Sequence, residues 1–240
     1  MNYTCTNQRP VRKTRLRQKG SILQPDTQLP NSCSPVRIGE TMPNFTARST
    51  QGVVSLDDFR GRWLVLFSHP ADFTPVCTSE FVAIARAAGA FAELGCDLMA
   101  LSVDSLFSHL AWIRAIHDRF DVEVSFPVIE DPTLEIARAY GMVAPDAADA
   151  SSVRATYFLD PEGILRASSC YPASVGRSVA EMLRTVTALQ RAQQGDVLVP
   201  ADWTPGEAVL EVPSHSVSDI LAADSATDWF YRTRPDGDAE

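Results

Sequence analysis

Hydrophobic positions along residues 36–195 alternate between two patterns, one typical of buried strands and one typical of amphipathic helices. Continuous apolar runs of strand length occur at 63–67 and 97–103, which indicates strands covered on both faces. Apolar residues spaced three and four apart follow each run, as expected for helices with one buried face. We predict strands at 45–47, 52–56, 63–67, 97–103, 126–129, 154–159 and 164–171, and helices at 78–95, 108–119, 132–140 and 178–193.

The order of these elements predicts an α/β fold with a mixed central sheet. Strands alternate with helices in the first part, and a hairpin with a tight turn at Asp160–Gly163 and a last helix close it. Asp104 and Ser105 are expected to cap the helix at 108–119. The helix at 132–140 has Pro132 in its expected first turn and Gly141 after its end.

The two ends of the chain differ from this central part. Residues 1–34 carry six lysines and arginines with no acidic residue before Asp26, which is typical of a disordered basic tail. An organelle transit peptide is the alternative for this segment. The segment lacks the apolar core of a secretory signal. Residues 196–240 are short, proline-bounded stretches. We therefore divide the chain into a tail (1–34), a main domain (35–195) and a small C-terminal domain (196–240).

Composition narrows the class of protein. Apolar residues make up 45% of the chain, and the net charge is −9, which argues against nucleic acid as a partner. No apolar stretch approaches the roughly 20 residues needed to span a bilayer. The five cysteines are odd in number, widely spaced and free of any CxxC pair. This usage fits a reducing compartment, and the expected location is the cytoplasm.

The segment Phe67–Phe81 contains the candidate chemistry. It joins the buried strand at 63–67 to a helix, and it places Cys77 in the first turn of that helix. Unpaired backbone N–H groups and the positive end of the helix dipole favour a thiolate there, and the thiolate is the reactive form. The alternative is that Cys77 is a small core residue, the usual role of a free cysteine.

Several motifs resemble one family. The segment Pro70–Cys77, Pro-Ala-Asp-Phe-Thr-Pro-Val-Cys, is similar to the Pro-x-x-x-Thr-x-x-Cys signature of peroxiredoxins, and its extension Ser68-His69 to Thr78 resembles the one-cysteine subfamily. The resemblance spans roughly 36–225. It implies a thioredoxin-like fold with a small C-terminal domain, and thiol-dependent reduction of hydrogen peroxide and organic hydroperoxides. Further matches are Leu101–Ser105, His109–Trp112, Val153-Arg154, Tyr171–Arg177, Ala201–Trp203 and Gly206-Glu207.

The resemblance assigns roles in the reaction to four residues. Cys77 is the cysteine that attacks the peroxide, and Thr74 hydrogen-bonds the peroxide and the sulfur. Pro70 shields the site from water, and Arg154 holds the thiolate and polarises the peroxide. These residue types suit the chemistry, since an arginine supplies fixed donors that stay charged and a threonine hydroxyl both donates and accepts. The alternatives are a helix cap for Thr74 and a solvated charge for Arg154.

Three more residues are supporting candidates by the same resemblance. His69 matches the active-site histidine of the subfamily, Glu80 matches an acid that orients Arg154, and Arg177 matches a second arginine. His69 is equally well explained as a packed histidine whose nitrogens bond the backbone.

The sulfenic acid that forms on Cys77 has to be reduced before it oxidises further. Two-cysteine peroxiredoxins use a Val-Cys-Pro element in their C-terminal part, and this chain has no cysteine after Cys170. Cys96 is expected to be buried and inert. We expect a one-cysteine cycle with an external thiol, glutathione or a thioredoxin-type protein, as reductant. A disulfide between Cys77 and Cys170 is the alternative.

The predicted function is a peroxidase without metal, haem or flavin, and the resemblance implies a homodimer or a larger ring. A peroxide sensor or holdase switched by Cys77 oxidation is the competing class. A disulfide reductase is disfavoured by the lack of CxxC. Phospholipase activity, known in the subfamily, is not expected, because Arg62 replaces its serine and Asp57 its histidine.

Overall fold

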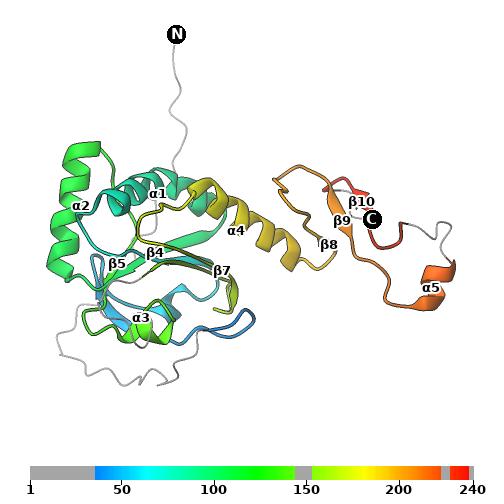
Figure 1. Cartoon of the computed structure of the whole chain (residues 1–240), viewed down its shortest axis with the longest axis horizontal. Coiled ribbons are helices and arrows are strands. Elements are labelled where there is room, and N and C mark those ends of the chain that lie inside the picture. The colour runs from blue at the N-terminus through cyan, green and yellow to red at the C-terminus, as the bar shows by residue number, and fades with distance from the viewer. Residues whose placement is uncertain (1–35, 144–152, 223–227, 238–240) are drawn as a thin grey trace, which may run out of the picture.

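The computed structural model describes residues 36–143, 153–222 and 228–237, which form a sheet between helices and a smaller C-terminal extension (Figure 1). The strands are β1 (Thr46–Ser49), β2 (Gly52–Ser55), β3 (Trp63–Ser68), β4 (Cys96–Ser102), β5 (Val128–Glu130), β6 (Arg154–Leu159), β7 (Leu165–Tyr171), β8 (Val197–Leu198), β9 (Val209–Glu211) and β10 (Thr233–Arg234). The helices are α1 (Pro75–Glu93), α2 (Leu106–Phe120), α3 (Glu135–Ala139), α4 (Val179–Gln193) and α5 (Val217–Ala222), with a 3-10 turn η1 (Leu56–Phe59).

Seven strands form the main sheet in the order β2-β1-β5-β4-β3-β6-β7. Strands β3, β4 and β5 run parallel, β6 pairs antiparallel with β3, and β7 pairs antiparallel with β6 at the edge of the sheet. β3 and β6 are buried along their whole length. The mixed α/β sheet predicted from the alternating pattern is therefore confirmed, and the unbroken apolar runs are its central strands.

Helices cover both faces of this sheet. Figure 1 shows α1 and α4 on one side and α3 on the other. Alternate residues of β3 divide between the two cores, since Val65 and Phe67 pack with α1 while Leu64 and Leu66 face α3. The sheet thus separates two apolar layers, and the loop after β3 emerges at the edge of the layer that contains α1.

Three predicted helix starts need correction, and one of them is that of α2, which begins at Leu106, two residues before the predicted start. Helix α1 begins at Pro75, three residues before the predicted start, because proline suits the first position of a helix. Helix α3 begins at Glu135, so Pro132 lies in the preceding turn and not in the helix. Leu134 there adopts a left-handed backbone (φ 59°), which breaks the helical path, and the Asp131 carboxylate accepts the Ala137 N–H at 2.7 Å.

The C-terminal part forms a second, three-stranded sheet in the order β10-β9-β8, and Figure 1 shows it extending away from the main sheet beyond α4. Its small core comprises Val197, Trp203 and Val209. None of the helices in the described ranges has the length and apolarity needed to cross a bilayer. The predicted tail at 1–34, with Cys5 and Cys33, lies outside the described residues.

Candidate active site

Cys77 lies where the sequence places it, in the first turn of the helix that follows β3. It is the third residue of α1, and its side chain is fully buried beside the apolar layer between that helix and the sheet. The first N–H groups of a helix have no partner within the helix and carry partial positive charge. The sulfur therefore lies buried at the positively polarised end of this helix.

Arg154 brings a positive charge to this sulfur. Its Nη1 donates to the Cys77 Sγ at 3.3 Å, while its Nε and Nη2 donate to the carbonyl of Ala173 at 3.1 and 2.6 Å. The side chain is 2% exposed, so the alternative of a solvated charge at a strand start is wrong. All three guanidinium nitrogens are engaged, which fixes the direction in which the charge faces the sulfur.

Glu80 binds two arginines at once. Its Oε2 accepts from Arg154 Nη1 at 2.6 Å and from Arg177 Nη2 at 2.9 Å, and its Oε1 accepts from Arg177 Nε and the Arg177 backbone N–H, both at 2.8 Å. Burial alone would raise the pKa of Glu80, but the hydrogen bonds and charge of Arg177, followed by Arg154, outweigh it and lower that pKa. Glu80 is therefore an anion that orients both guanidinium groups.

Arg177 completes this buried network from the segment before α4. Its Nη1 donates to the Ala155 carbonyl at 2.8 Å, and its guanidinium carbon lies 5.1 Å from the centre of the Phe67 ring. The arginine thus links β6 and the end of β3 to the helix that carries Glu80. The structure brings together Cys77, Arg154, Glu80 and Arg177, although they lie up to 100 residues apart in the sequence.

The loop before Cys77 holds two further candidates, Pro70 and Thr74. Thr74 occupies the position before α1, but its hydroxyl donates to the Ala71 carbonyl at 2.9 Å, so it caps no helix N–H group and the capping alternative is wrong. Pro70 is half-buried. Phe73, between them, has a left-handed backbone (φ 56°) and is 59% exposed. The loop therefore has a sharp, constrained turn just before the reactive cysteine.

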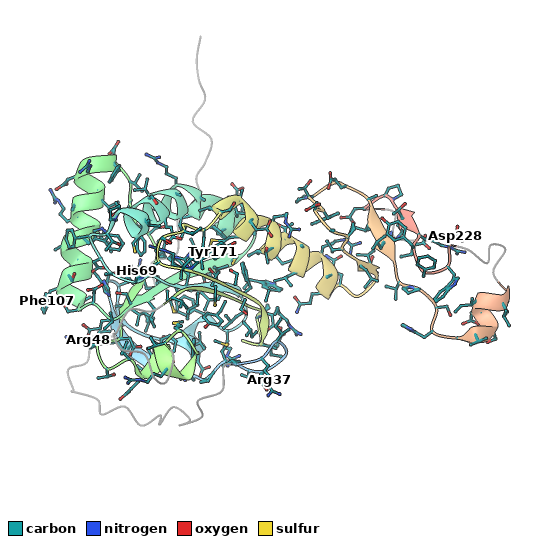
Figure 2. All side chains as sticks on the ribbon, viewed as in Figure 1. Arg37, Arg48, His69, Phe107, Tyr171 and Asp228 are labelled. Carbon is teal, nitrogen blue, oxygen red and sulfur yellow. The ribbon has the colours of Figure 1, made fainter. Side chains whose placement is uncertain are left out.

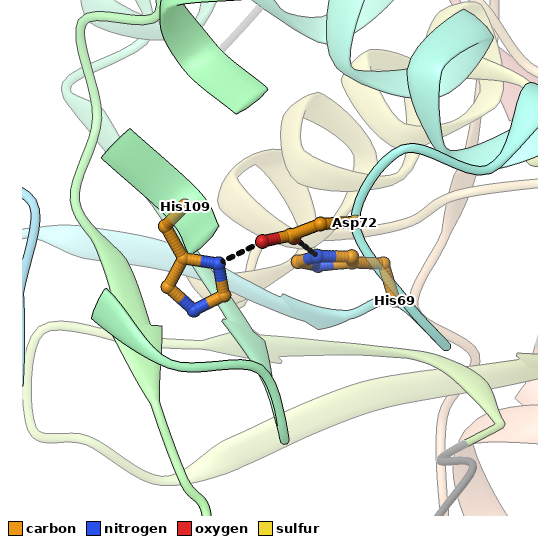
Figure 3. A group of neighbouring side chains, drawn as sticks. All are labelled: His69, Asp72 and His109. Atoms are coloured by element: carbon orange, nitrogen blue, oxygen red, sulfur yellow. Dashed lines mark hydrogen bonds and ion pairs between the residues drawn. The ribbon is translucent and has the colours of Figure 1, made fainter. Parts of the chain in front are cut away.

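His69 belongs to a cluster that the sequence analysis did not identify. Its Nε2 lies 2.9 Å from Asp72 Oδ1, and the other oxygen of Asp72 lies 2.8 Å from Nδ1 of His109 (Figure 3). Asp72 stands inside the cysteine motif and His109 inside a matching motif, yet neither had an assigned role. The signal available in the sequence was one aspartate, Asp72, that lies between His69 and His109 along the chain.

The charge states of this cluster follow from its burial and bonds. Burial lowers the pKa of His69 despite the hydrogen bond to Asp72. Burial alone would raise the pKa of Asp72, but hydrogen bonds with His109 and His69 outweigh it and hold that pKa far below its usual value. The three ligand-type atoms lie within 4.8 Å of one another, close enough to hold a metal ion. They already bond each other, so the hydrogen bonds account for their arrangement.

The other two described cysteines stand apart from this site. Cys96 is the first residue of β4, and burial raises its pKa to about 12, so it is an inert thiol. Cys170 is exposed on β7, directly opposite Ala155, while Arg154 is opposite Tyr171. Directly opposite residues share a face and neighbours alternate. Because Arg154 points to Cys77, Cys170 points to the other face of the sheet.

We expect the free energy of unfolding to fall as the pH falls from about 6.5 to 6 and again, more steeply, below about 3.8, because between these ranges Asp131, whose pKa burial raises to about 6, offsets the loss. The lowered pKa of His69, from 6.5, means that the unfolded chain takes up this proton first. Glu80 and Asp72, lowered from 4.5 and 3.8, stabilise the fold above those values, and this contribution is lost below them. Each group adds a slope of up to about 1.4 kcal/mol per pH unit. Urea unfolding across this range measures it, and a flat profile would contradict these assignments.

Comparison with known proteins gives a consistent result. Residues 38–168 match the model of the AhpC/TSA family. A peroxiredoxin of Aquifex aeolicus is 49% identical over 186 residues, covering 77% of this chain and 84% of that protein. A crystal structure of a cysteine-to-serine mutant of Peroxiredoxin 6 of Arenicola marina superposes with a TM-score of 0.76 at 34% identity, covering 85% of this chain and all of that one. The structure of a yeast mitochondrial 1-Cys peroxiredoxin, described by its thiol resolving mechanism via glutathione/thioredoxin systems, gives a TM-score of 0.71 at 38% identity. The match covers 78% of this chain and 92% of that one.

Proposed function

Because the chain belongs to the peroxiredoxin family, whose members are thiol peroxidases with a thioredoxin-like fold, we propose that Cys77 is the sulfur that reduces hydrogen peroxide and organic hydroperoxides. The observation that carries this proposal is the 3.3 Å contact from Arg154 Nη1 to the Cys77 Sγ, inside a buried network. The helix N-terminus adds a second positive influence on the same atom. Together they place two sources of positive charge beside the atom that attacks the peroxide in this proposal.

The reaction needs little beyond these groups. The thiolate attacks one oxygen of the hydroperoxide, so an S–O bond forms while the O–O bond breaks. The departing oxygen takes the electron pair and the proton of the hydroperoxide and leaves as water or an alcohol, and one proton from the solvent converts the resulting sulfenate to the sulfenic acid. Arg154 stabilises the negative charge as it moves from sulfur to oxygen. The role of Thr74 is to present its hydroxyl to the peroxide, which requires it to turn from its bond with Ala71.

The oxidised sulfur is returned to the thiolate by an external thiol. This thiol attacks the sulfenic acid, water leaves, and a mixed disulfide forms that a second thiol then reduces. Two observations support a one-cysteine cycle of this kind. Cys170 points to the sheet face opposite Cys77, and the yeast relative described with glutathione and thioredoxin systems is similar over most of the chain.

Trapping the oxidised intermediate tests this cycle. After one equivalent of peroxide, we expect Cys77 to form a dimedone adduct at full occupancy, seen by intact mass and peptide mapping. Cys170→Ser is the matched control and should give the same adduct, because its side chain lies across the sheet. A loss of two protons, with a peptide linking Cys77 and Cys170, would contradict the one-cysteine cycle.

Turnover separates an enzyme from a sensor. With excess peroxide and either the glutathione or the thioredoxin system, we expect many equivalents of peroxide to be consumed per protein. Consumption that stops at one equivalent with both systems would favour the sensor. The side-by-side comparison also identifies the reductant class.

A further inference from the structure

A continuous line of buried hydrogen bonds runs from β5 to the end of β3. His109, on α2, lies 3.3 Å from the Ile129 carbonyl through Nε2 and 2.8 Å from Asp72 through Nδ1, and Asp72 in turn bonds His69. The two histidines are fully buried and Asp72 is 7% exposed. Figure 2 shows His69 inside the body, between the sheet and the helices. The mechanism above uses none of these three bonds.

The hydrogen-bond partners of His69 and His109 determine which ring nitrogens carry protons. A carboxylate only accepts, so the Nδ1 of His109, which lies 2.8 Å from Asp72, carries a proton. The same carboxylate faces Nε2 of His69. A neutral imidazole carries one proton, so the proton of His69 lies on Nε2, and its Nδ1 is the nitrogen able to accept.

We propose that Asp72 and His109 are positioning residues of the peroxidase site, fixing His69 as the tautomer protonated on Nε2 and holding the loop that leads to Cys77. The proposal rests on the assignment of Cys77 above. It gives His69 a defined chemical state in the segment that leads to Cys77, since an imidazole with an unprotonated Nδ1 accepts a proton or hydrogen bond from that side and donates none.

The loop itself is tied down at the same aspartate. The backbone N–H of Asp72 donates to Asp104 Oδ2 at 2.8 Å, so the side chain and main chain of one residue bind two different segments. The next residue, Phe73, has the left-handed backbone, which is unfavourable for a residue with a side chain and persists only when neighbours enforce it. The His69 ring lies 4.9 Å from the ring of Phe81, one helical turn beyond Cys77. A displacement of His69 in this cluster would therefore also displace Phe81 and the helix that carries the sulfur.

Nitrogen NMR of the wild-type protein tests the assignment directly. With ¹⁵N-labelled histidine, we expect His69 to show a protonated Nε2 and an unprotonated Nδ1 at neutral pH, as one tautomer. Of the four histidines in the chain, His69 is assigned by its absence in a His69→Gln variant. A proton on Nδ1 would overturn the proposal whatever the variants do, and this result does not depend on Cys77 being the reactive sulfur.

Asp72→Asn tests the function of the carboxylate. An asparagine offers one acceptor oxygen where two ring N–H groups need one each, so His69 should lose its single tautomer. We expect the rate of Cys77 oxidation to fall about 10- to 100-fold, the scale seen when a carboxylate that orients a histidine is removed. Asp118→Asn, on the exposed surface of α2, is the matched control and should change neither the rate nor the His69 signals.

His109 offers a graded test. His109→Asn retains an amide N–H close to the position of Nδ1 and should keep most of the rate, while His109→Leu removes the donor and should lose about as much as Asp72→Asn. His117→Leu, at an exposed site of the same helix, is the control. Equal rates in the two His109 variants, or slower oxidation with His69 still wholly protonated on Nε2, would overturn the proposal. If Cys77→Ser retained peroxide consumption, the proposed function would fail instead.

Discussion

Replacing Cys77 by serine is expected to abolish peroxide consumption with both the glutathione and the thioredoxin systems. A serine hydroxyl is about the size of the thiol, so the buried site should remain folded, but the hydroxyl stays protonated and is a poor nucleophile without a base. Arg154 stabilises an anion at that position, and serine does not supply one. Stopped-flow and steady-state peroxide assays measure the loss, and circular dichroism checks the fold.

The other cysteines provide the controls for this result. Cys96→Ser should leave turnover nearly intact, because burial keeps the Cys96 thiol protonated at the far end of its strand pair. Cys170→Ser should also be active, since Cys170 lies on the opposite face of the sheet. Substantial turnover by Cys77→Ser, or its loss in either control, would show that a different sulfur carries the reaction.

Glu80→Gln is expected to lower the free energy of unfolding by about 3–5 kcal/mol, the usual cost of removing one partner of a buried ion pair. Glu80 accepts three hydrogen bonds from two guanidinium groups that are each 2% exposed, and a fourth from the Arg177 backbone N–H. A neutral amide leaves both arginines buried without their carboxylate and places its own NH₂ group against one of them. Urea unfolding at pH 7 measures the difference.

Activity should fall in the same variant, because Arg154 loses one of the groups that hold it against Cys77. Glu181→Gln is the matched control. Glu181 pairs with Arg184 at an exposed site, where the expected cost is under about 1 kcal/mol. A similar, small cost in both variants would mean that Glu80 is compensated by neighbours and does not orient the arginines.

The sequence predicted those features that depend on local pattern. The unbroken apolar run at 63–67 is a strand buried on both faces, and Cys77 lies in the first helical turn after it. The match of Arg154, Glu80 and Arg177 to the family pattern named residues that the fold then brings together. No local pattern predicts that Arg154 is buried, because a charge at a strand start is ordinarily solvated.

Features that depend on register or on long-range contacts were not predictable. The face that Cys170 occupies follows from its pairing with Ala155, which the sequence does not reveal. The late start of α3 depends on a left-handed Leu134, a conformation that leucine rarely adopts. The bond between Asp72 and His109 joins residues 37 positions apart, and only the folded chain shows it.

The sulfur and the three charged groups around it have a consequence for the order of events. With Cys77 as the thiolate of the proposed mechanism, two guanidinium groups, one carboxylate and one thiolate sum to zero, so the reduced pocket is electrically balanced. Conversion of the thiolate to a neutral sulfenic acid leaves one positive charge in excess. The spent pocket thereby attracts an anion, and the thiolate form of the incoming reductant is the anion that restores neutrality.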